Sequence, residues 1–196
     1  KLVICGGGHI SIPIIQIGKM LDFHVCVLED RVSFADNAKR AGADKVICDV
    51  FSEGLEQIKG DKDTFFVIVT RGHRYDLDCL ERIIQKENAY IGMIGSRLKV
   101  KKTKEALIEK GVLPEKLDKV FAPIGLKISA ETPSEIAVAI MAEIIQVKNT
   151  IQRSEGFTKE ILSAAANNSE NIGMALVTIV SKKGSAPRKA GTKMLV

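Results

Sequence analysis

Short, almost continuously apolar runs alternate with amphipathic segments over roughly the first 150 residues. The apolar runs predict strands at residues 2–5, 24–28, 45–48, 64–70, 89–94 and 120–124. Helical spacing predicts helices at 9–21, 76–86, 97–110 and 133–151, and another from Ser33, where Asp36 completes a capping pattern. Strands that are apolar on both faces are typical of a parallel sheet between two helical layers. We therefore predict an α/β fold with a doubly wound, mainly parallel sheet.

The pattern changes after about residue 153. Residues 154–156 (Ser-Glu-Gly) predict a linker, and a short helix at 157–166, a strand at 174–180 and the start of another at 194–196 follow. Two strands without further cover do not form a stable unit. We expect residues 1–153 to form one domain, and 154–196 to be the beginning of a second, small α+β domain that is cut off.

Composition limits the classes of function. No apolar run of the 196 residues approaches the eighteen or so that span a membrane, and Lys1 leads directly into a strand, so we expect a cytoplasmic protein without a signal peptide. The net charge of +5 equals the charge of residues 97–104 alone, which contain Arg97, Lys99, Lys101, Lys102 and Lys104. Such a local patch, without a recognisable motif, does not indicate nucleic-acid binding. It is either a solvated helix face or a contact for phosphate or a partner.

Cysteine and histidine spacing argues against a metal site. The four cysteines form no C-x-x-C pair, and the three histidines lie far apart. No combination of nucleophile and base stands out either. We expect neither a metal site nor catalytic residues, which favours a protein that is not an enzyme.

A glycine turn follows the first strand. Gly6 and Gly8 match the first two glycines of G-x-G-x-x-G, Ser11 stands where the third would be, and Gly7 and His9 complete the turn. A strand before and a helix after the turn place backbone N–H groups and a helix N-terminus together, which suits a phosphate. His9 is either a ligand contact or a simple turn residue.

A second glycine turn, Gly95-Ser96-Arg97, links the strand at 89–94 to the basic helix. Two such turns predict a phosphorylated ligand, of dinucleotide size, in a Rossmann-like cleft. Glu29 ends the second strand, where an acid would hold a ribose 2′-hydroxyl. Asp30 and Arg31 follow at once, and Arg31 would instead accommodate a 2′-phosphate, so the choice between NAD and NADP stays open.

Three further residues are candidates for ligand contact because of their place along the chain. Thr70 and His73 lie at the carboxyl end of the strand at 64–70. Glu131 precedes a helix start in which Thr132 and Glu135 form a capping box, and unlike them it has no structural role to explain it. We expect these side chains to face the cleft.

Several motifs together resemble the xanthine dehydrogenase accessory family (XdhC/CoxF/CoxI). The resemblance rests on Gly6–His9, on Glu29-Asp30-Arg31, and above all on residues 90–97 (Y-I-G-M-I-G-S-R), 122–126 (A-P-I-G-L) and 131–137 (E-T-P-S-E-I-A). Residues 175–196 resemble the opening of the family's CoxI-like domain, which commonly precedes the Rossmann part. The order of the two parts is thus one departure from the family. Another is Thr70-Arg71-Gly72-His73, where the family pattern has Thr-His-x-His.

The resemblance implies an accessory factor, or chaperone, that binds the molybdenum cofactor and delivers it to a xanthine-dehydrogenase-type molybdenum hydroxylase. The cofactor is a pterin with a phosphate, to which a nucleotide is attached in some bacteria. A cysteine desulfurase and a homo-oligomeric state are also expected. Two alternatives stay open from the residues alone: an NAD(P)-dependent oxidoreductase, and a nucleotide-sensing module.

Overall fold

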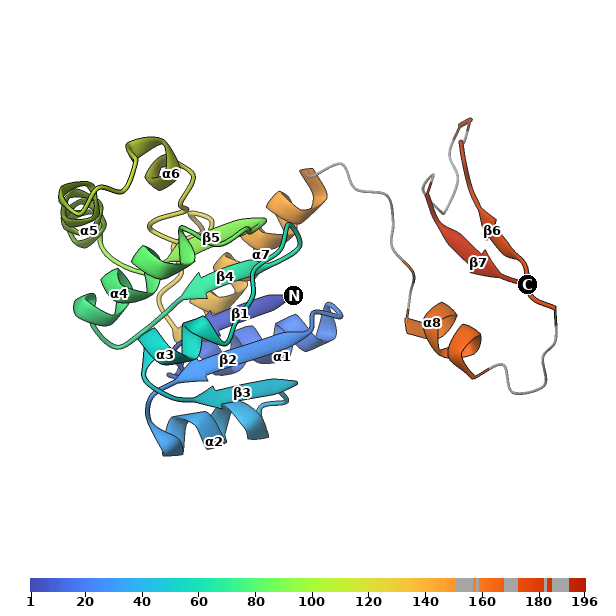
Figure 1. Ribbon diagram of the computed structural model, residues 1–196, viewed down its shortest axis with the longest axis horizontal. Helices are drawn as coiled ribbons and strands as arrows, with labels where there is room; N and C mark the ends of the chain where they lie inside the picture. Colours follow the sequence, from blue (N-terminus) through green and yellow to red (C-terminus); the bar gives the residue numbers. More distant parts are fainter. Residues whose placement is uncertain (151–156, 158, 168–172, 182, 185–190) are drawn as a thin grey trace. The chain divides into compact units, whose positions relative to one another are not determined.

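The computed structural model describes residues 1–150, 157, 159–167, 173–181, 183–184 and 191–196. The chain divides into two compact units, Lys1–Thr150 and Ile151–Val196 (Figure 1). The linker expected at 154–156, and with it the domain boundary expected after residue 153, lies outside the described residues. Within the described part, no helix combines the length and the apolar character that a membrane span requires.

The first unit contains a five-stranded parallel sheet in the order β3-β2-β1-β4-β5. Its strands are β1 (Leu2–Cys5), β2 (Val25–Glu29), β3 (Lys45–Cys48), β4 (Phe65–Ile68) and β5 (Tyr90–Met93). The central strand β1 is in register with both neighbours, since Ile4 lies opposite Val27 and Val67. The doubly wound parallel sheet predicted from the apolar runs is thereby confirmed.

Helices cover both faces of this sheet (Figure 1). They are α1 (Ser11–Met20), α2 (Val32–Arg40), α3 (Phe51–Glu56), α4 (His73–Ile83), α5 (Arg97–Glu109), α6 (Pro114–Asp118) and α7 (Pro133–Thr150). Alternate strand residues enter opposite cores: Leu2 and Ile4 pack with α1, α2 and α7, whereas Val3 and Cys5 pack with α3 to α6. The period of two along each strand explains why the strands are apolar throughout.

The second unit has α8 (Lys159–Ala166) and an antiparallel pair, β6 (Leu176–Thr178) and β7 (Lys193–Leu195). Leu176 lies opposite Leu195 in this pair. The small two-stranded sheet fits the expected α+β character of the C-terminal segment.

The structure corrects three predicted elements. Residues 120–124 form only a bridge between Phe121 and Gly92, because Pro123 has no N–H to continue a ladder. The helix expected from Ser33 begins at Val32, after Arg31, and no side chain caps it. The helix expected from residue 76 already begins at His73.

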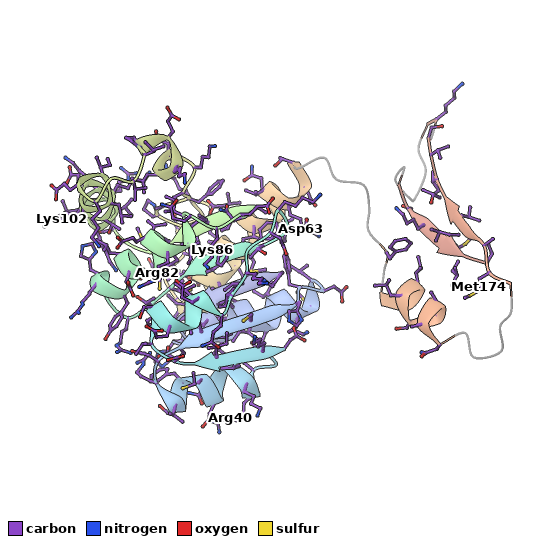
Figure 2. All side chains as sticks on the ribbon, in the orientation of Figure 1. Arg40, Asp63, Arg82, Lys86, Lys102 and Met174 are labelled. Atoms are coloured by element: carbon purple, nitrogen blue, oxygen red, sulfur yellow. The ribbon has the colours of Figure 1, made fainter. Side chains whose placement is uncertain are left out.

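The basic segment 97–104 lies on α5, where it mostly faces solvent. Arg97, Lys101 and Lys102 are exposed, and Lys101 pairs with Glu105 one turn further on. Figure 2 shows Lys102 on the outer side of α5. Lys99 differs from these residues, because its amine lies 2.5 Å from the buried carboxylate of Asp76 on α4.

A buried hydrogen bond fastens α7 to the sheet. The hydroxyl of Tyr90 donates to Oε2 of Glu143 at 2.5 Å, and the same oxygen accepts from the N–H of Gly125 at 3.0 Å. Burial and this bond raise the pKa of the Tyr90 hydroxyl. The carboxylate thus holds β5, the segment at 125 and α7 together.

Replacing Tyr90 by Phe tests this link, because it leaves the buried carboxylate of Glu143 with one donor fewer. An unsatisfied buried polar group costs about 1–3 kcal/mol, so urea unfolding should show a loss of that size in the free energy of unfolding. Tyr75→Phe is the control: its hydroxyl accepts from the partly exposed Arg71, and the expected loss is below about 1 kcal/mol. Equal losses in the two variants would contradict the assignment.

Candidate functional site

The topology brings four connecting segments to one edge of the sheet. Because β1 pairs in parallel with β2 on one side and with β4 on the other, the direction of winding changes at β1. In such a sheet, ligands bind outside the carboxyl ends of the strands at this switch point. The segments there follow β1, β2, β4 and β5, and they contain most of the candidate residues predicted from the sequence.

The turn after β1 is held in place by bonds that only a glycine at its first position allows. Gly6 has a φ of +113°, and a Cβ at this position would lie 2.6 Å from the carbonyl oxygen of Val69. The N–H of Gly6 donates to Leu28, and its carbonyl accepts from the buried hydroxyl of Ser11 at 2.6 Å. Ser11, at the position of the third glycine, therefore fixes the turn through its bond to Gly6.

The remainder of the turn offers free donors. A Cβ on Gly8 would have no atom within 4 Å, so the backbone at Gly8 borders open space. Among the described contacts, the N–H groups of Gly8, His9 and Ile10 donate no hydrogen bond. These three donors lie at the N-terminus of α1, and a helix N-terminus carries a partial positive charge. This arrangement would suit an anion, as helix N-termini with free donors do.

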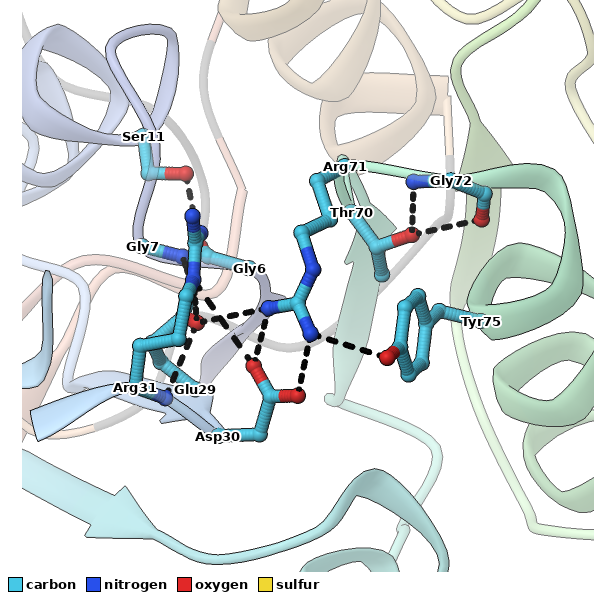
Figure 3. Close-up of polar contacts among 10 residues, drawn as sticks. All are labelled: Gly6, Gly7, Ser11, Glu29, Asp30, Arg31, Thr70, Arg71, Gly72 and Tyr75. Atoms are coloured by element: carbon cyan, nitrogen blue, oxygen red, sulfur yellow. Dashed lines mark hydrogen bonds and ion pairs between the residues drawn. The ribbon is translucent and has the colours of Figure 1, made fainter.

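Glu29 lies beneath this turn and is engaged by the protein itself. Its side chain is 1% exposed, and its Oε2 accepts from the N–H of Gly7 at 2.6 Å (Figure 3). Oε2 also accepts from Nη2 of Arg31 at 3.1 Å, while Oε1 accepts from Nε of Arg31 at 2.7 Å and from its backbone N–H at 3.1 Å. Four donors thus occupy the four acceptor positions of one carboxylate.

A second carboxylate–arginine pair lies beside the first and connects the ends of β2 and β4. Asp30 accepts from both terminal nitrogens of Arg71, at 2.5 and 2.8 Å. Arg71 also donates to the hydroxyl of Tyr75 at 2.8 Å and lies over its ring. Burial alone would raise the pKa of Asp30, but the hydrogen bonds and charge of Arg71, together with smaller contributions from neighbouring groups, outweigh it, and the pKa lies below its ordinary value.

Thr70 takes part in a third polar group, which lies between β4 and α5. Its hydroxyl donates to Oδ1 of the fully buried Asp76 at 2.6 Å, and the other oxygen of Asp76 pairs with Lys99. Ser96 is the N-cap of α5, since its side chain accepts from the N–H of Lys99. The structure thus links Thr70 to Ser96, while Gly95 has a φ of +154° beside the stem of Lys99.

The other predicted residues make few contacts with these groups. His73 is the first residue of α4, and its Nδ1 lies 3.2 Å from the hydroxyl of Thr103 on α5. His9 and Arg97 are exposed, and neither side chain has a partner among the described residues. Glu131 is exposed at the start of α7, and its backbone N–H donates to Glu135. The capping box of Thr132 and Glu135 is confirmed.

Two residues that the sequence analysis did not select, and Lys99, which it named only within the basic patch, are central to the arrangement. Arg71 donates to Asp30, while Asp76 accepts from Thr70 and pairs with Lys99. A signal for Arg71 was present, because it directly follows the strand predicted at 64–70, and Asp30 directly follows Glu29 at the end of the second strand. Asp76 gave no such signal, since an acid in the first turn of a helix is ordinarily solvated.

No group of three or more metal-ligating side chains is assembled in the part of the chain that the structure describes. Asp30 and Tyr75 also line a hollow of about 640 Å³ beside α3 and α4, together with Phe51, Arg74 and Lys110. Asp30 therefore both borders this hollow and binds Arg71.

Comparisons with known proteins identify the family of the chain. Residues 2–144 match the family model described as the XdhC Rossmann domain, and residues 169–196 match the XdhC and CoxI family. The chain belongs to the XdhC family. The order of the two matches confirms that the Rossmann part of this XdhC-family chain precedes its CoxI-like segment.

Two curated relatives match this XdhC-family chain over about three quarters of its length. The uncharacterized protein YqeB of Escherichia coli (strain K12) is 34% identical over 150 residues, which are 76% of this chain and 27% of YqeB. A protein of Bacillus subtilis (strain 168) named as a probable xanthine dehydrogenase subunit is 28% identical over 151 residues, 77% of this chain and 44% of the relative. The chain thus spans less than half of either relative.

A solved structure shows the same fold. The crystal structure of a xanthine dehydrogenase from Bacillus halodurans superimposes with a TM-score of 0.68 at 26% sequence identity, over 79% of this chain and 44% of that chain. The Rossmann fold of this XdhC-family chain therefore has a counterpart in an experimental structure.

The two outer glycines of the turn should respond differently to substitution. Gly6→Ala combines a left-handed φ with a clash against backbone, so we expect a loss of at least about 2 kcal/mol in the free energy of unfolding. Gly8→Ala adds a methyl group into open space at an ordinary φ and should stay within about 0.5 kcal/mol. Urea unfolding of both variants checks this; a large loss for Gly8→Ala would show that Gly8 has a structural role.

Proposed function

We propose that this chain binds the molybdenum cofactor as an accessory factor for a xanthine-dehydrogenase-type molybdenum hydroxylase. Membership of the XdhC family and the names of the Bacillus relatives support the link to xanthine dehydrogenase. The observation that carries the proposal is the row of three N–H groups at Gly8, His9 and Ile10, which have no partner among the described contacts, with open space beside Gly8.

The residues present fit a phosphate-bearing pterin. A phosphate dianion at the start of α1 would accept from fixed backbone donors, and the helix dipole would add about 0.3–2 kcal/mol. Three cations near the site, Arg31, Arg71 and Lys99, are already paired with carboxylates. In this proposal the exposed side chains of His9 and Arg97 therefore contact the rest of the ligand.

The width of the switch point suits a ligand larger than a phosphate alone. The turn after β1 and the turn after β5 are separated by β4, which at ordinary strand spacing puts them about 10 Å apart. A phosphate on the first turn would leave a fused ring system within reach of the second. The cofactor supplies molybdenum chemistry to the client enzyme, and in this proposal the chain's own residues bind, orient and release it.

Substitution of Gly8 tests the position of the site. Gly8→Leu places a bulky side chain where the phosphate would approach, so we expect loss of cofactor binding, with Gly8→Ala intermediate. The measurement is native mass spectrometry of the protein offered molybdenum cofactor, NADH and NADPH at equal concentration. Glu109→Leu, an exposed change at the far end of α5, is the control and should bind like wild type.

Three outcomes decide between the candidate functions. Retention of the pterin by wild type and its loss in Gly8→Leu would support the accessory role and this site. Retention of a nicotinamide nucleotide instead would favour an oxidoreductase or a nucleotide sensor. Unchanged pterin binding in Gly8→Leu would refute the placement at the first glycine turn.

Delivery to a client needs its own measurement. We expect the loaded protein to restore activity to a cofactor-free xanthine-dehydrogenase-type enzyme faster than the same amount of free cofactor, and Gly8→Leu to lose this advantage. Equal rates with and without the protein would argue against the accessory role.

A further inference from the structure

We propose that the cleft selects a phosphate ester that carries no ribose at the end of β2, because Arg31 and Arg71 keep the ribose subsite closed. The inference rests on the proposed phosphate site at Gly8. It names the chemical class of the ligand: the nucleotide-free pterin phosphate, in preference to a nucleotide-extended form or to a nicotinamide dinucleotide.

The first step concerns the acid that a dinucleotide would need. In dinucleotide-binding folds, the acid at the end of the second strand accepts from the ribose hydroxyls. Here that acid is Glu29, whose four acceptor positions are filled by the N–H of Gly7 and by three donors of Arg31. With 1% of the side chain exposed, a ribose hydroxyl has neither access to the carboxylate nor a free lone pair on it.

The second step concerns the path beyond Glu29. Arg71 crosses from the end of β4 to Asp30 at the end of β2, and Figure 3 shows its guanidinium between Asp30 and Tyr75, on the side of Glu29 away from Ser11. Its Nη1 also lies 3.8 Å from Oε1 of Glu29. A nucleoside that extends from the glycine turn past the end of β2 would have to displace this bridge.

The third step concerns the strength of the closure. Asp30 is 14% exposed at its side chain, and its bond with Arg71 is bidentate, the geometry in which an arginine–carboxylate pair is strongest. Arg31 is held in addition by the ring of Phe34, 3.6 Å from its guanidinium carbon. Both guanidinium groups are thus fixed by a carboxylate and an aromatic ring.

The donors of the first turn remain open while the ribose side is filled. Within the described contacts, Gly8, His9 and Ile10 keep their N–H groups free, whereas Gly7 donates inward to Glu29. A compact phosphate ester can use the free donors without disturbing either arginine. A dinucleotide must break at least one bidentate pair, which lowers its affinity.

Removal of either arginine should therefore improve the binding of a dinucleotide. Arg71→Ala opens the path toward the hollow beside α3 and α4, and Arg31→Ala frees acceptor positions on Glu29. A hydrogen bond to a charged group is worth about 1.5–3 kcal/mol, so we expect NADH to bind about ten- to a hundredfold more tightly to each variant. Arg40→Ala, on the outer side of α2 (Figure 2), is the control and should leave NADH binding unchanged.

The measurement is a calorimetric titration of wild type and the three variants with NADH and with nucleotide-free molybdenum cofactor. Wild type should prefer the nucleotide-free cofactor by at least about tenfold, and the preference should shrink in both test variants. Because Arg71 is 37% exposed at its side chain, Arg71→Ala should fold even if Arg31→Ala does not; circular dichroism checks both.

Two results would overturn the inference: equal affinity of wild type for NADH and for the nucleotide-free cofactor, or unchanged NADH affinity in a folded Arg71→Ala variant. Neither result bears on whether Gly8 holds a phosphate. If wild type binds no phosphate ester at all, the proposed function fails, and a gain of NADH binding in Arg71→Ala still decides the question of the ribose subsite.

Discussion

The buried carboxylate of Glu29 is the contact on which the geometry of the site depends. A charge at 1% exposure is costly unless hydrogen bonds and an opposite charge compensate it, and Glu29 has both. Its bond to Gly7 ties the turn after β1 to the end of β2. Since the turn cannot shift without breaking this bond, the donors at Gly8 and beyond are held in one direction before any ligand arrives.

The same bond separates two parts of the candidate site that have different properties. On one side of Glu29, the N–H groups of Gly8, His9 and Ile10 have no partner among the described contacts, and Gly8 borders open space. On the other side, Arg31 and Arg71 use their charges internally, on Glu29 and Asp30. The glycine turn and the acid at the end of β2 are the residue types that indicate a dinucleotide. In this arrangement, however, only the glycine turn keeps free hydrogen-bonding groups. What matters is which donors and acceptors remain free.

Much of the fold could be predicted because burial on both faces leaves a plain signal. The strands around Ile4, Val27 and Val67 are apolar throughout, and the parallel sheet follows from this. Where a local rule conflicted with other bonds, prediction failed. Ser33 has a capping pattern, yet the helix begins at Val32, after Arg31, whose backbone and side chain are held by Glu29. Pro123 interrupts what the apolar run suggested was a strand.

The candidate site was harder to predict, because nothing local pairs Asp30 with Arg71, 41 residues away. Only the strand order, in which β2 and β4 flank β1, makes them neighbours across the turn.

The two glycine turns resemble each other in sequence but differ in what they leave for a ligand. At the second turn, the side chain of Ser96 takes the N–H of Lys99, and the amine of Lys99 is held by Asp76. At the first turn, no side chain caps α1, because Ile10 has no group that could accept a bond. The N–H groups of an uncapped helix start can donate to water or to a ligand, and a phosphate supplies several acceptors at once. The first turn is therefore where we propose that the phosphate binds, and in this proposal Arg97 contacts the other end of the ligand.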